Sequence, residues 1–266
     1  MARSALLNVM VQAALKAGKS LSRDFGEVQN LQVSVKGPGD FVSQADLKAE
    51  KIVHDELMKA RPTYDFLGEE GGEEKGSDGA HRWIVDPLDG TTNFLHGIPQ
   101  FAVSIALERN GEVVAGVIFN PATDELYTAE RGGGAFLNDR RIRVAARKQI
   151  TDCVVSCGVP HLGRGDHGKF LVELRHVMGE VAGVRRFGAA SLDLAYVAAG
   201  RLDGFWETGL APWDIAAGLV LIREAGGFVS DMKGGQDIFD NGSVIAGNEY
   251  IHRALTEVVN RPVPGR

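Results

Sequence analysis

The sequence predicts a mixed α/β protein built from two parts that meet near residue 150. Three patterns support this fold class. Apolar residues recur at helical spacing over residues 4–25. Short strands separated by turn residues over 101–137 are typical of an antiparallel meander. Beyond residue 150, predicted strands and helices alternate along the chain.

The first part opens with two helices. The apolar stripe of the first consists of Leu6, Met10, Ala13, Ala17 and Leu21. A polar stretch rich in glycine and proline follows around 36–40. Asp46 then opens a second helix, which runs to Ala60 and is closed by the Arg61-Pro62 step because the residue before a proline disfavours helix.

Short strands follow, and the first two stop at acidic residues. Residues 64–68 stop at Glu69-Glu70, after which a charged, glycine-rich surface loop runs through Asp78. Residues 82–85 stop abruptly at Asp86-Pro87, because proline cannot donate to the ladder. The meander is expected to comprise strands at 101–109, 113–119, 125–129 and 135–137.

The second part alternates strands and helices after a strand at 153–157. Helices are expected near 166–182, 190–200, 214–226 and 249–260, with strands near 184–187, 203–207, 227–231 and 243–246. No repeat or flexible linker separates the parts, so we expect one compact body. Its subdomains would be 1–150, with the antiparallel sheet and most of the metal ligands discussed below, and 151–260, followed by a frayed tail at 261–266.

Composition bounds the partners and the compartment. The 29 Lys+Arg against 35 Asp+Glu give a net charge of −6, which disfavours direct nucleic-acid binding. Cys153 and Cys157 lie on one predicted strand, roughly 13 Å apart, which is too far for a disulfide and indicates buried thiols in a reducing cytosol. The first helix does not resemble a signal peptide, and the longest apolar run, near 216–222, is too short to span a bilayer. We therefore expect a cytoplasmic protein with no membrane partner.

Acidic residues fall at the ends of three separate elements. Glu69 and Glu70 end one strand, Asp86 and Asp89 follow another, and Asp214 begins a helix. An acidic residue at the end of a single element is more often part of a solvated turn or a helix cap. Caps do not require three acidic element ends, however, and converging carboxylates repel one another unless cations hold them. The combination predicts a site for Mg²⁺.

The segment that starts at Asp86 adds a place for a phosphate group. Asp86 and Asp89 are three residues apart across a turn, close enough to share cations. Gly90 and Thr91 then lead into a helical turn whose free N–H groups can hold a phosphate. A phosphate between such N–H groups and oxygen-bound cations indicates phosphoryl transfer.

Three motifs of this sequence resemble the signature of the inositol monophosphatase family. They are Gly68-Glu69-Glu70, the segment 83–94 and the segment 213–218. The resemblance extends over nearly the whole chain, and residues 188–196 and 223–227 resemble its bacterial extragenic-suppressor-type branch. It implies a layered α-β-α-β-α sandwich and an enzyme that hydrolyses inositol monophosphate and similar polyol monophosphates with Mg²⁺.

The resemblance also implies a set of metal ligands. Glu69, Asp86 and the backbone carbonyl of Leu88 match the ligands of a first, tighter Mg²⁺ ion. Asp86, Asp89 and Asp214 match those of a second ion, and a third, weaker ion would rest on Glu69. Glu69 is therefore also expected to act in catalysis, and Asp214 to contact the substrate.

Further residues match the family's catalytic and substrate-binding positions. Thr91, paired with Asp46, would activate the attacking water, and the N–H groups of Gly90 and Thr91 would bind the phosphate. Glu207 would hold substrate hydroxyls, and Ala190 would line the same pocket. The implied mechanism is in-line attack by metal-activated water without a covalent phosphoenzyme.

Other chemistry-bearing residues carry weaker patterns. No Cys-x₅-Arg phosphate loop follows Cys153, which disfavours a nucleophilic thiol. The glycines at 132–134 lead into another strand, so they indicate a hairpin and not a nucleotide fingerprint. The loop 161–168 is expected at the surface, and the role of Lys36 stays open because its spacing departs from the family by one residue. Arg185-Arg186 could serve a phosphate, a subunit contact or a solvated edge strand.

Two other functions stay open at this point. Related phosphatases act on fructose 1,6-bisphosphate, 3′-phosphoadenosine 5′-phosphate or histidinol phosphate with the same metal ligands, although Glu207 favours a polyol because it would repel a second phosphate. The extragenic-suppressor branch suggests a regulatory role with RNA polymerase or ribosome-assembly factors as protein partners. The resemblance further implies a homodimer and a lithium-sensitive enzyme.

The acidic balance thus acquires a local meaning. Six acids are assigned to one pocket: Asp46, Glu69, Asp86, Asp89, Glu207 and Asp214. Two or three Mg²⁺ ions would add about +4 to +6 there and reverse its sign.

Overall fold

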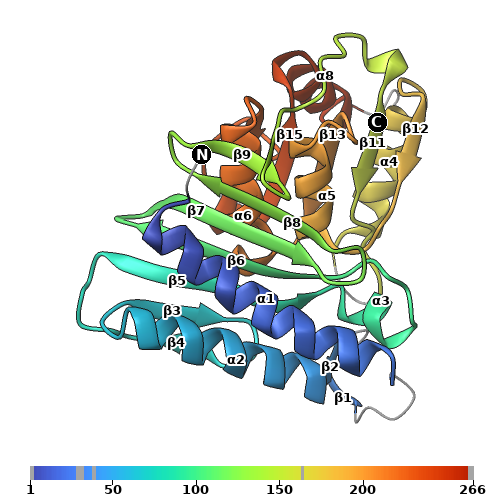
Figure 1. The fold of residues 1–266 in the computed structure, drawn as a ribbon. Helices are drawn as coiled ribbons and strands as arrows, with labels where there is room; N and C mark the ends of the chain where they lie inside the picture. Colours follow the sequence, from blue (N-terminus) through green and yellow to red (C-terminus); the bar gives the residue numbers. More distant parts are fainter. Residues whose placement is uncertain (1–2, 28–32, 38–39, 163–164, 263–266) are drawn as a thin grey trace.

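Two sheets alternate with three layers of helices in the computed structural model (Figure 1). It describes residues 3–27, 33–37, 40–162 and 165–262, and the side chains of residues 28–42 are not described. The side chain of Lys36 and part of the 161–168 loop therefore lie outside the described residues. The order of layers is helices, sheet, helices, sheet, helices. The layered α-β-α-β-α sandwich expected from the sequence is confirmed.

The first layer consists of α1 (Ala5–Phe25) and α2 (Gln44–Ala60), which pack together on the larger sheet. The predicted start of α2 at Asp46 is wrong by two residues. Ser43 caps the helix, since its Oγ accepts the N–H of Ala45 at 3.1 Å, while the Asp46 carboxylate accepts the N–H of Ser43 at 2.8 Å. This reciprocal arrangement places the buried Asp46 on the first turn and not at the helix end.

The larger sheet has eight strands in the order β10-β9-β8-β7-β6-β5-β3-β4. The strands are β3 (Asp65–Gly68), β4 (Gly72–Glu74), β5 (His81–Asp89), β6 (Ala102–Arg109), β7 (Glu112–Asn120), β8 (Glu125–Glu130), β9 (Gly134–Leu137) and β10 (Arg140–Ile142). The predicted meander is confirmed as β6 to β9 and continues into β10. All its pairings are antiparallel, and the turns between neighbouring strands are short.

Two predictions of irregular backbone were wrong. A short antiparallel hairpin, β1 (Val33–Gly37) and β2 (Asp40–Ser43), stands where only a polar stretch was expected. The short strand β4 lies within the expected surface loop after Glu69 and pairs with β3. These three strands are only three to five residues long, which is too short for a pattern of alternation to be recognised.

The smaller sheet has five strands in the order β12-β11-β13-β15-β14. They are β11 (Val154–Cys157), β12 (Gly183–Arg185), β13 (Gly204–Thr208), β14 (Phe228–Ser230) and β15 (Ser243–Gly247). The outer face carries α4 (His167–Met178) and α8 (Glu249–Val259), with α7 (Ile238–Asn241) and the 3-10 turn η2 (Ile150–Asp152) in the connections. Both cysteines are free and buried, as predicted.

The middle layer consists of α5 (Ala190–Ala198) and α6 (Pro212–Glu224), which lie between the two sheets (Figure 1). The residues of α6 from Ile215 to Ile222 are all buried, because the helix contacts β5 to β9 on one side and β14 on the other. An apolar surface around the whole helix is what such a position requires. Among the described residues, no helix is long and apolar enough to cross a membrane.

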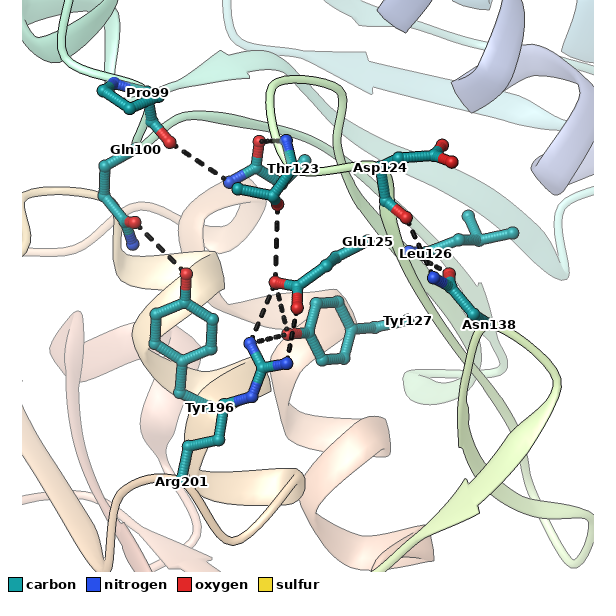
Figure 2. Close-up of polar contacts among 11 residues, drawn as sticks. Pro99, Gln100, Thr123, Asp124, Glu125, Leu126, Tyr127, Asn138, Tyr196 and Arg201 are labelled. Atoms are coloured by element: carbon teal, nitrogen blue, oxygen red, sulfur yellow. Dashed lines mark hydrogen bonds and ion pairs between the residues drawn. The ribbon is translucent and has the colours of Figure 1, made fainter.

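A polar cluster fastens the end of α5 to the larger sheet (Figure 2). The guanidinium of Arg201, just beyond α5, forms an ion pair with Glu125 of β8 and donates to the hydroxyl of Tyr127 at 3.0 Å. Arg201 thereby holds the pKa of Glu125 below its usual value. Tyr196 of α5 donates to Gln100 Oε1 at 3.1 Å. The end of α5 is therefore joined both to β8 and to the segment that precedes β6.

Candidate active site

Parallel pairing brings the first two acidic element ends together. Strand β3 pairs with β5 in parallel, with Gly68 opposite Val85, so the carboxyl ends of both strands lie at one edge of the sheet. Glu69 follows β3 directly, and its N–H donates to the carbonyl of Val85 at 3.2 Å. Glu69 and Asp86 therefore leave neighbouring strands at the same level.

Strand β5 does not stop at Pro87, contrary to the prediction. It runs on to Asp89, and its pairing with β6 shifts between Asp86, opposite Ser104, and Asp89, opposite Ala102. An interval of three residues on β5 thus faces an interval of two residues on β6, which is a β-bulge. A bulge accommodates a proline, which has no N–H to donate to the ladder. The bulge allows Asp86 and Asp89 to lie on one stretch of sheet edge instead of opposite faces.

Beyond the bulge the chain turns sharply into α3 (Thr91–Leu95). Gly90 has φ of 91°, and a Cβ atom there would lie 2.8 Å from the carbonyl oxygen of Gln100, so no other residue fits. Thr91 Oγ1 lies 2.9 Å from Asp46 Oδ1 and 3.0 Å from the carbonyl oxygen of Leu88. The structure therefore brings together the predicted pair of Thr91 and Asp46, which is 45 residues apart in sequence.

The second part of the chain supplies the opposite wall of a cavity of about 530 Å³. Asp214 lies on the first turn of α6, where its Oδ2 accepts the N–H of Ala211 at 2.7 Å. Ala190 begins α5, and Glu207 lies on β13 with its carboxyl group against Gly158. The lining includes Glu69, Asp89, Ala190, Glu207 and Asp214 among the predicted residues. The predicted residues that do not line this cavity lie on or beside α2, β5 and α3, and they are Asp46, Asp86, Leu88, Gly90 and Thr91.

Electrostatics confirm that these carboxyl groups are neighbours. Burial, followed by the charges of Glu69, Asp89 and Asp214, raises the pKa of Asp86 well above its usual value. Burial likewise raises the pKa of Asp89 to about 6, although hydrogen bonds from Ser191 oppose this shift. Carboxylates that raise one another's pKa form a site at which a cation is strongly stabilising.

The donor set fits a hard cation. Carboxylate oxygens and a backbone carbonyl are the ligands that Mg²⁺ prefers. In the described part of the chain, no three His, Cys, Asp or Glu side chains already stand as a ready metal cage. Asp86 Oδ1 instead accepts the N–H of Leu88 at 2.9 Å, and Asp214 is turned to Ala211. A bound ion would therefore use other oxygens of these carboxylates or replace these hydrogen bonds.

Several residues of the site carried no role in the sequence analysis. Asp193 of α5 is 2% exposed and lines the cavity, and burial raises its pKa to about 8. Arg186, for which a phosphate was one of three predicted alternatives, also lines the cavity. Ser191 contacts Asp89, and Glu50 of α2 contacts the loop after Glu69. Only helical spacing, three residues from Ala190, could have placed Asp193 toward the cavity.

Burial also disfavours the cysteine thiols as nucleophiles. Burial raises the pKa of both Cys153 and Cys157 to about 12. A thiol with such a pKa stays protonated at neutral pH and is a poor nucleophile. His161 lines the cavity, and the described residues of its loop, 161–162 and 165–168, are exposed.

Comparisons with known proteins agree with the fold and the site. The sequence pattern of the inositol monophosphatase family matches residues 2–264. The chain is 75% identical to the inositol-1-monophosphatase of Rhizobium meliloti over all of both chains, and 44% identical to the Nus factor SuhB of Pseudomonas aeruginosa over 97% of each. The crystal structure of the extragenic suppressor protein SuhB from Bartonella henselae superposes with a TM-score of 0.96 at 65% identity, covering 98% of this chain and 100% of that one.

The layered fold, the acidic cavity and these likenesses define a phosphoric monoester hydrolase. Within that class, the chain belongs to the inositol monophosphatase family.

Proposed function

We propose that this enzyme hydrolyses inositol monophosphate, and similar polyol monophosphates, to the polyol and phosphate with the help of Mg²⁺. One observation carries the proposal: a single cavity is lined by Glu69, Asp89, Asp214 and Glu207. The first three residues suit cations that bind a phosphate group. Glu207 suits the hydroxyl groups of a polyol.

Glu69, Asp86, the carbonyl of Leu88, Asp89 and Asp214 would hold two Mg²⁺ ions, and Glu69 would take part in holding a third. When bound, these ions supply Lewis-acid stabilisation of the charge that develops during phosphoryl transfer. The N–H groups of Gly90 and Thr91, at the turn that only glycine permits, would orient the phosphate.

Thr91 and Asp46 would orient and deprotonate the attacking water. The Thr91 hydroxyl can donate to Asp46 Oδ1 at 2.9 Å, which turns a lone pair of Oγ1 outward as an acceptor for a water proton. Asp46 is itself fixed, because its Oδ2 accepts from both the N–H and the hydroxyl of Ser43 at 2.8 and 2.5 Å. A fully buried acceptor held by two donors keeps its position throughout turnover.

Glu207 would select the polyol. Burial and the neighbouring acids Asp193, Asp214 and Asp89 raise its pKa, while Arg186 opposes that rise. In its ionised form the carboxyl group accepts hydrogen bonds from hydroxyl groups and repels a second phosphate. Fructose 1,6-bisphosphate is accordingly expected to be a poorer substrate than inositol 1-phosphate.

A substrate panel tests this proposal. Initial rates on inositol 1-phosphate, fructose 1,6-bisphosphate, 3′-phosphoadenosine 5′-phosphate and histidinol phosphate are compared with and without Mg²⁺, and with added Li⁺. We expect the highest kcat/KM on inositol 1-phosphate, no turnover without Mg²⁺ and inhibition by Li⁺. A higher kcat/KM on one of the other three substrates would overturn the polyol assignment, and full activity in a chelator would overturn the metal assignment.

A second function is favoured by one finding, the 44% identity to a protein named Nus factor SuhB. We propose that the chain also binds a protein of the transcription machinery, and that it does so as a homodimer. An Asp86→Asn variant is expected to lose phosphatase activity but to keep the cellular function of the gene. Sedimentation of the purified protein tests the dimer, and loss of both functions together in the variant would argue against a separate binding role.

A further inference from the structure

Ser191 makes an unusually complete contact with one oxygen of Asp89. It is the second residue of α5 and is fully buried. Its N–H donates to Asp89 Oδ2 at 2.7 Å, and its hydroxyl donates to the same oxygen at 2.5 Å. The two residues are 102 positions apart, so this contact joins the bulged end of β5 to the middle layer.

The contact limits what Asp89 can offer to a cation. Each oxygen of a carboxylate has two lone pairs in its plane. Two donors from Ser191 occupy the acceptor capacity of Oδ2, and they also prevent the carboxyl group from rotating. Asp89 lines the cavity and also takes a hydrogen bond from the backbone of Ala190, so the acceptor capacity that it retains for an ion belongs to Oδ1.

One available oxygen suits one kind of ion. Mg²⁺ demands octahedral geometry with short bonds and takes carboxylates through single oxygens. Ca²⁺ takes six to eight oxygens at longer distances and often binds both oxygens of a carboxylate. A carboxylate with one oxygen blocked is therefore a better ligand for Mg²⁺ than for Ca²⁺.

We propose that Ser191 is a positioning residue that restricts Asp89 to one metal-facing oxygen and thereby makes the site prefer Mg²⁺ over Ca²⁺. This inference rests on the metal site of the proposed function. It assigns to Ser191 no contact with the substrate or the ion. Its effect passes entirely through the orientation of Asp89.

Metal binding without substrate tests the inference. Isothermal titration with Mg²⁺, and separately with Ca²⁺, is performed on the native protein and on Ser191→Ala and Ser191→Thr variants. In Ser191→Ala the affinity for Mg²⁺ is expected to fall about tenfold, as is usual when a hydrogen-bond partner of a ligand is removed. The affinity for Ca²⁺ is expected to fall much less, because the freed oxygen can join the coordination. Threonine retains the hydroxyl group and is expected to restore the native ratio.

Ser230 provides a matched control. It is 1% exposed and its hydroxyl is also fully engaged, since it donates to the carbonyl of Asp231 at 2.9 Å and lies 2.8 Å from His252 Nε2. It lies on β14 and does not line the cavity. Ser230→Ala is expected to lower stability without changing the Mg²⁺ to Ca²⁺ affinity ratio.

The outcomes separate this inference from the proposed function. Native protein that binds no Mg²⁺ would contradict the metal site itself. Native protein that binds Mg²⁺, with an unchanged affinity ratio in Ser191→Ala, would overturn the role of Ser191 alone. If circular dichroism shows that Ser191→Ala is unfolded, Ser191→Cys is titrated instead, because a thiol has similar size but donates weakly. It is held to the same two criteria.

Discussion

At the scale of single residues, the absence of a side chain on Gly158 determines where Glu207 lies. A Cβ atom on Gly158 would lie 1.8 Å from the carboxyl carbon of Glu207, so only glycine leaves room for this carboxyl group. Gly158 directly follows β11, so the carboxyl group of Glu207 lies against the backbone at the end of that strand. Gly158 therefore acts on substrate recognition without a functional group of its own.

Replacement of this glycine should alter KM selectively. In Gly158→Ala the displaced carboxyl group loses its hydrogen bonds to the polyol, so KM for inositol 1-phosphate is expected to rise about five- to tenfold, as for ~1 kcal/mol of lost hydrogen bonding. Turnover of p-nitrophenyl phosphate, whose leaving group has no hydroxyl groups to bind, should stay within about twofold. Gly179→Ala is the control, because its Cβ would have only ordinary contacts beyond 3.4 Å. An equal loss on both substrates would contradict this role.

Two aspartates of the first part, Asp89 and Asp65, are expected to differ in their effect on catalysis. Asp89→Asn removes a charged ligand and is expected to lower kcat/KM by at least ~100-fold, since a bound ion contributes several kcal/mol to the transition state. Asp65 instead accepts the N–H of Gly76 at 2.8 Å and pairs with Lys75, so Asp65→Asn should leave kcat/KM within about twofold. Steady-state kinetics at saturating Mg²⁺ compare them, and similar losses in both variants would refute the assignment of Asp89.

At the scale of elements, helix α2 holds the loop that carries Glu69. Glu50 is 7% exposed, and its two carboxylate oxygens accept the N–H groups of Glu70 at 2.9 Å and Gly71 at 2.6 Å. Gly68 and Gly71 also leave the space in which this carboxyl group lies. The position of a proposed metal ligand thus depends on a residue of the outer helical layer.

Removal of this clamp should affect both stability and metal use. Glu50→Ala leaves two N–H groups without their acceptor, so the free energy of unfolding is expected to fall by about 1–3 kcal/mol. The Mg²⁺ concentration for half-maximal activity should rise, because Glu69 is held less firmly. Glu56→Ala on the same helix loses only an exposed pair with Lys16 and should cost at most ~1 kcal/mol. Urea unfolding and Mg²⁺ titration measure both effects, and an unchanged Mg²⁺ requirement would contradict the clamp.

Elements with a strong local pattern could be predicted from the sequence. The apolar spacing of α1 and the turn residues of the meander gave both features within one or two residues. The continuation of β5 through Pro87 could not be predicted, because the proline is tolerated only where β6 supplies a bulged partner. The hairpin of β1 and β2 was missed because each of its strands is only four or five residues long.

The candidate site was predicted to a different extent in its two parts. Motif residues such as Asp86 and Asp214 could be identified because an aspartate carries a metal-binding carboxylate wherever it lies in the fold. Ser191 and Gly158 could not, since a serine and a glycine acquire a role only through what lies opposite them in space. The residues that position the charged groups therefore emerge only from the folded chain.

At the scale of the whole molecule, one half-buried histidine links stability to pH. His252 of α8 lies within hydrogen-bond distance of Ser230, and burial lowers its pKa below the usual value of about 6.5. A lowered pKa means that the folded chain resists a proton that the unfolded chain accepts. The contribution of His252 to stability is thus fully present above about pH 6.5 and is lost as the pH falls toward its folded-state pKa.

Denaturant unfolding between pH 8 and pH 5 tests this link. Asp89 and Asp193, whose pKa values are raised, act in the opposite direction, so the test compares variants and not the sign of the native slope. As the pH is lowered, the native protein is expected to lose stability relative to the His252→Asn variant, which cannot titrate at this position. His167→Asn at the exposed start of α4 is the control and should retain the native slope. Parallel slopes for the His252 variant and the native protein would contradict the contribution of His252.

The cavity has walls from every inner layer of the sandwich. Glu69 and Asp89 come from the larger sheet, Ala190 and Asp214 from the middle helices, and Glu207 from the smaller sheet. The cavity is complete only when these layers have packed together. Activity regained during refolding therefore reports the packing of the layers against one another, and it should lag behind the return of helical circular dichroism. A tight inhibitor in the cavity would join all these layers at once and would slow hydrogen exchange in both sheets, far beyond the residues that it touches.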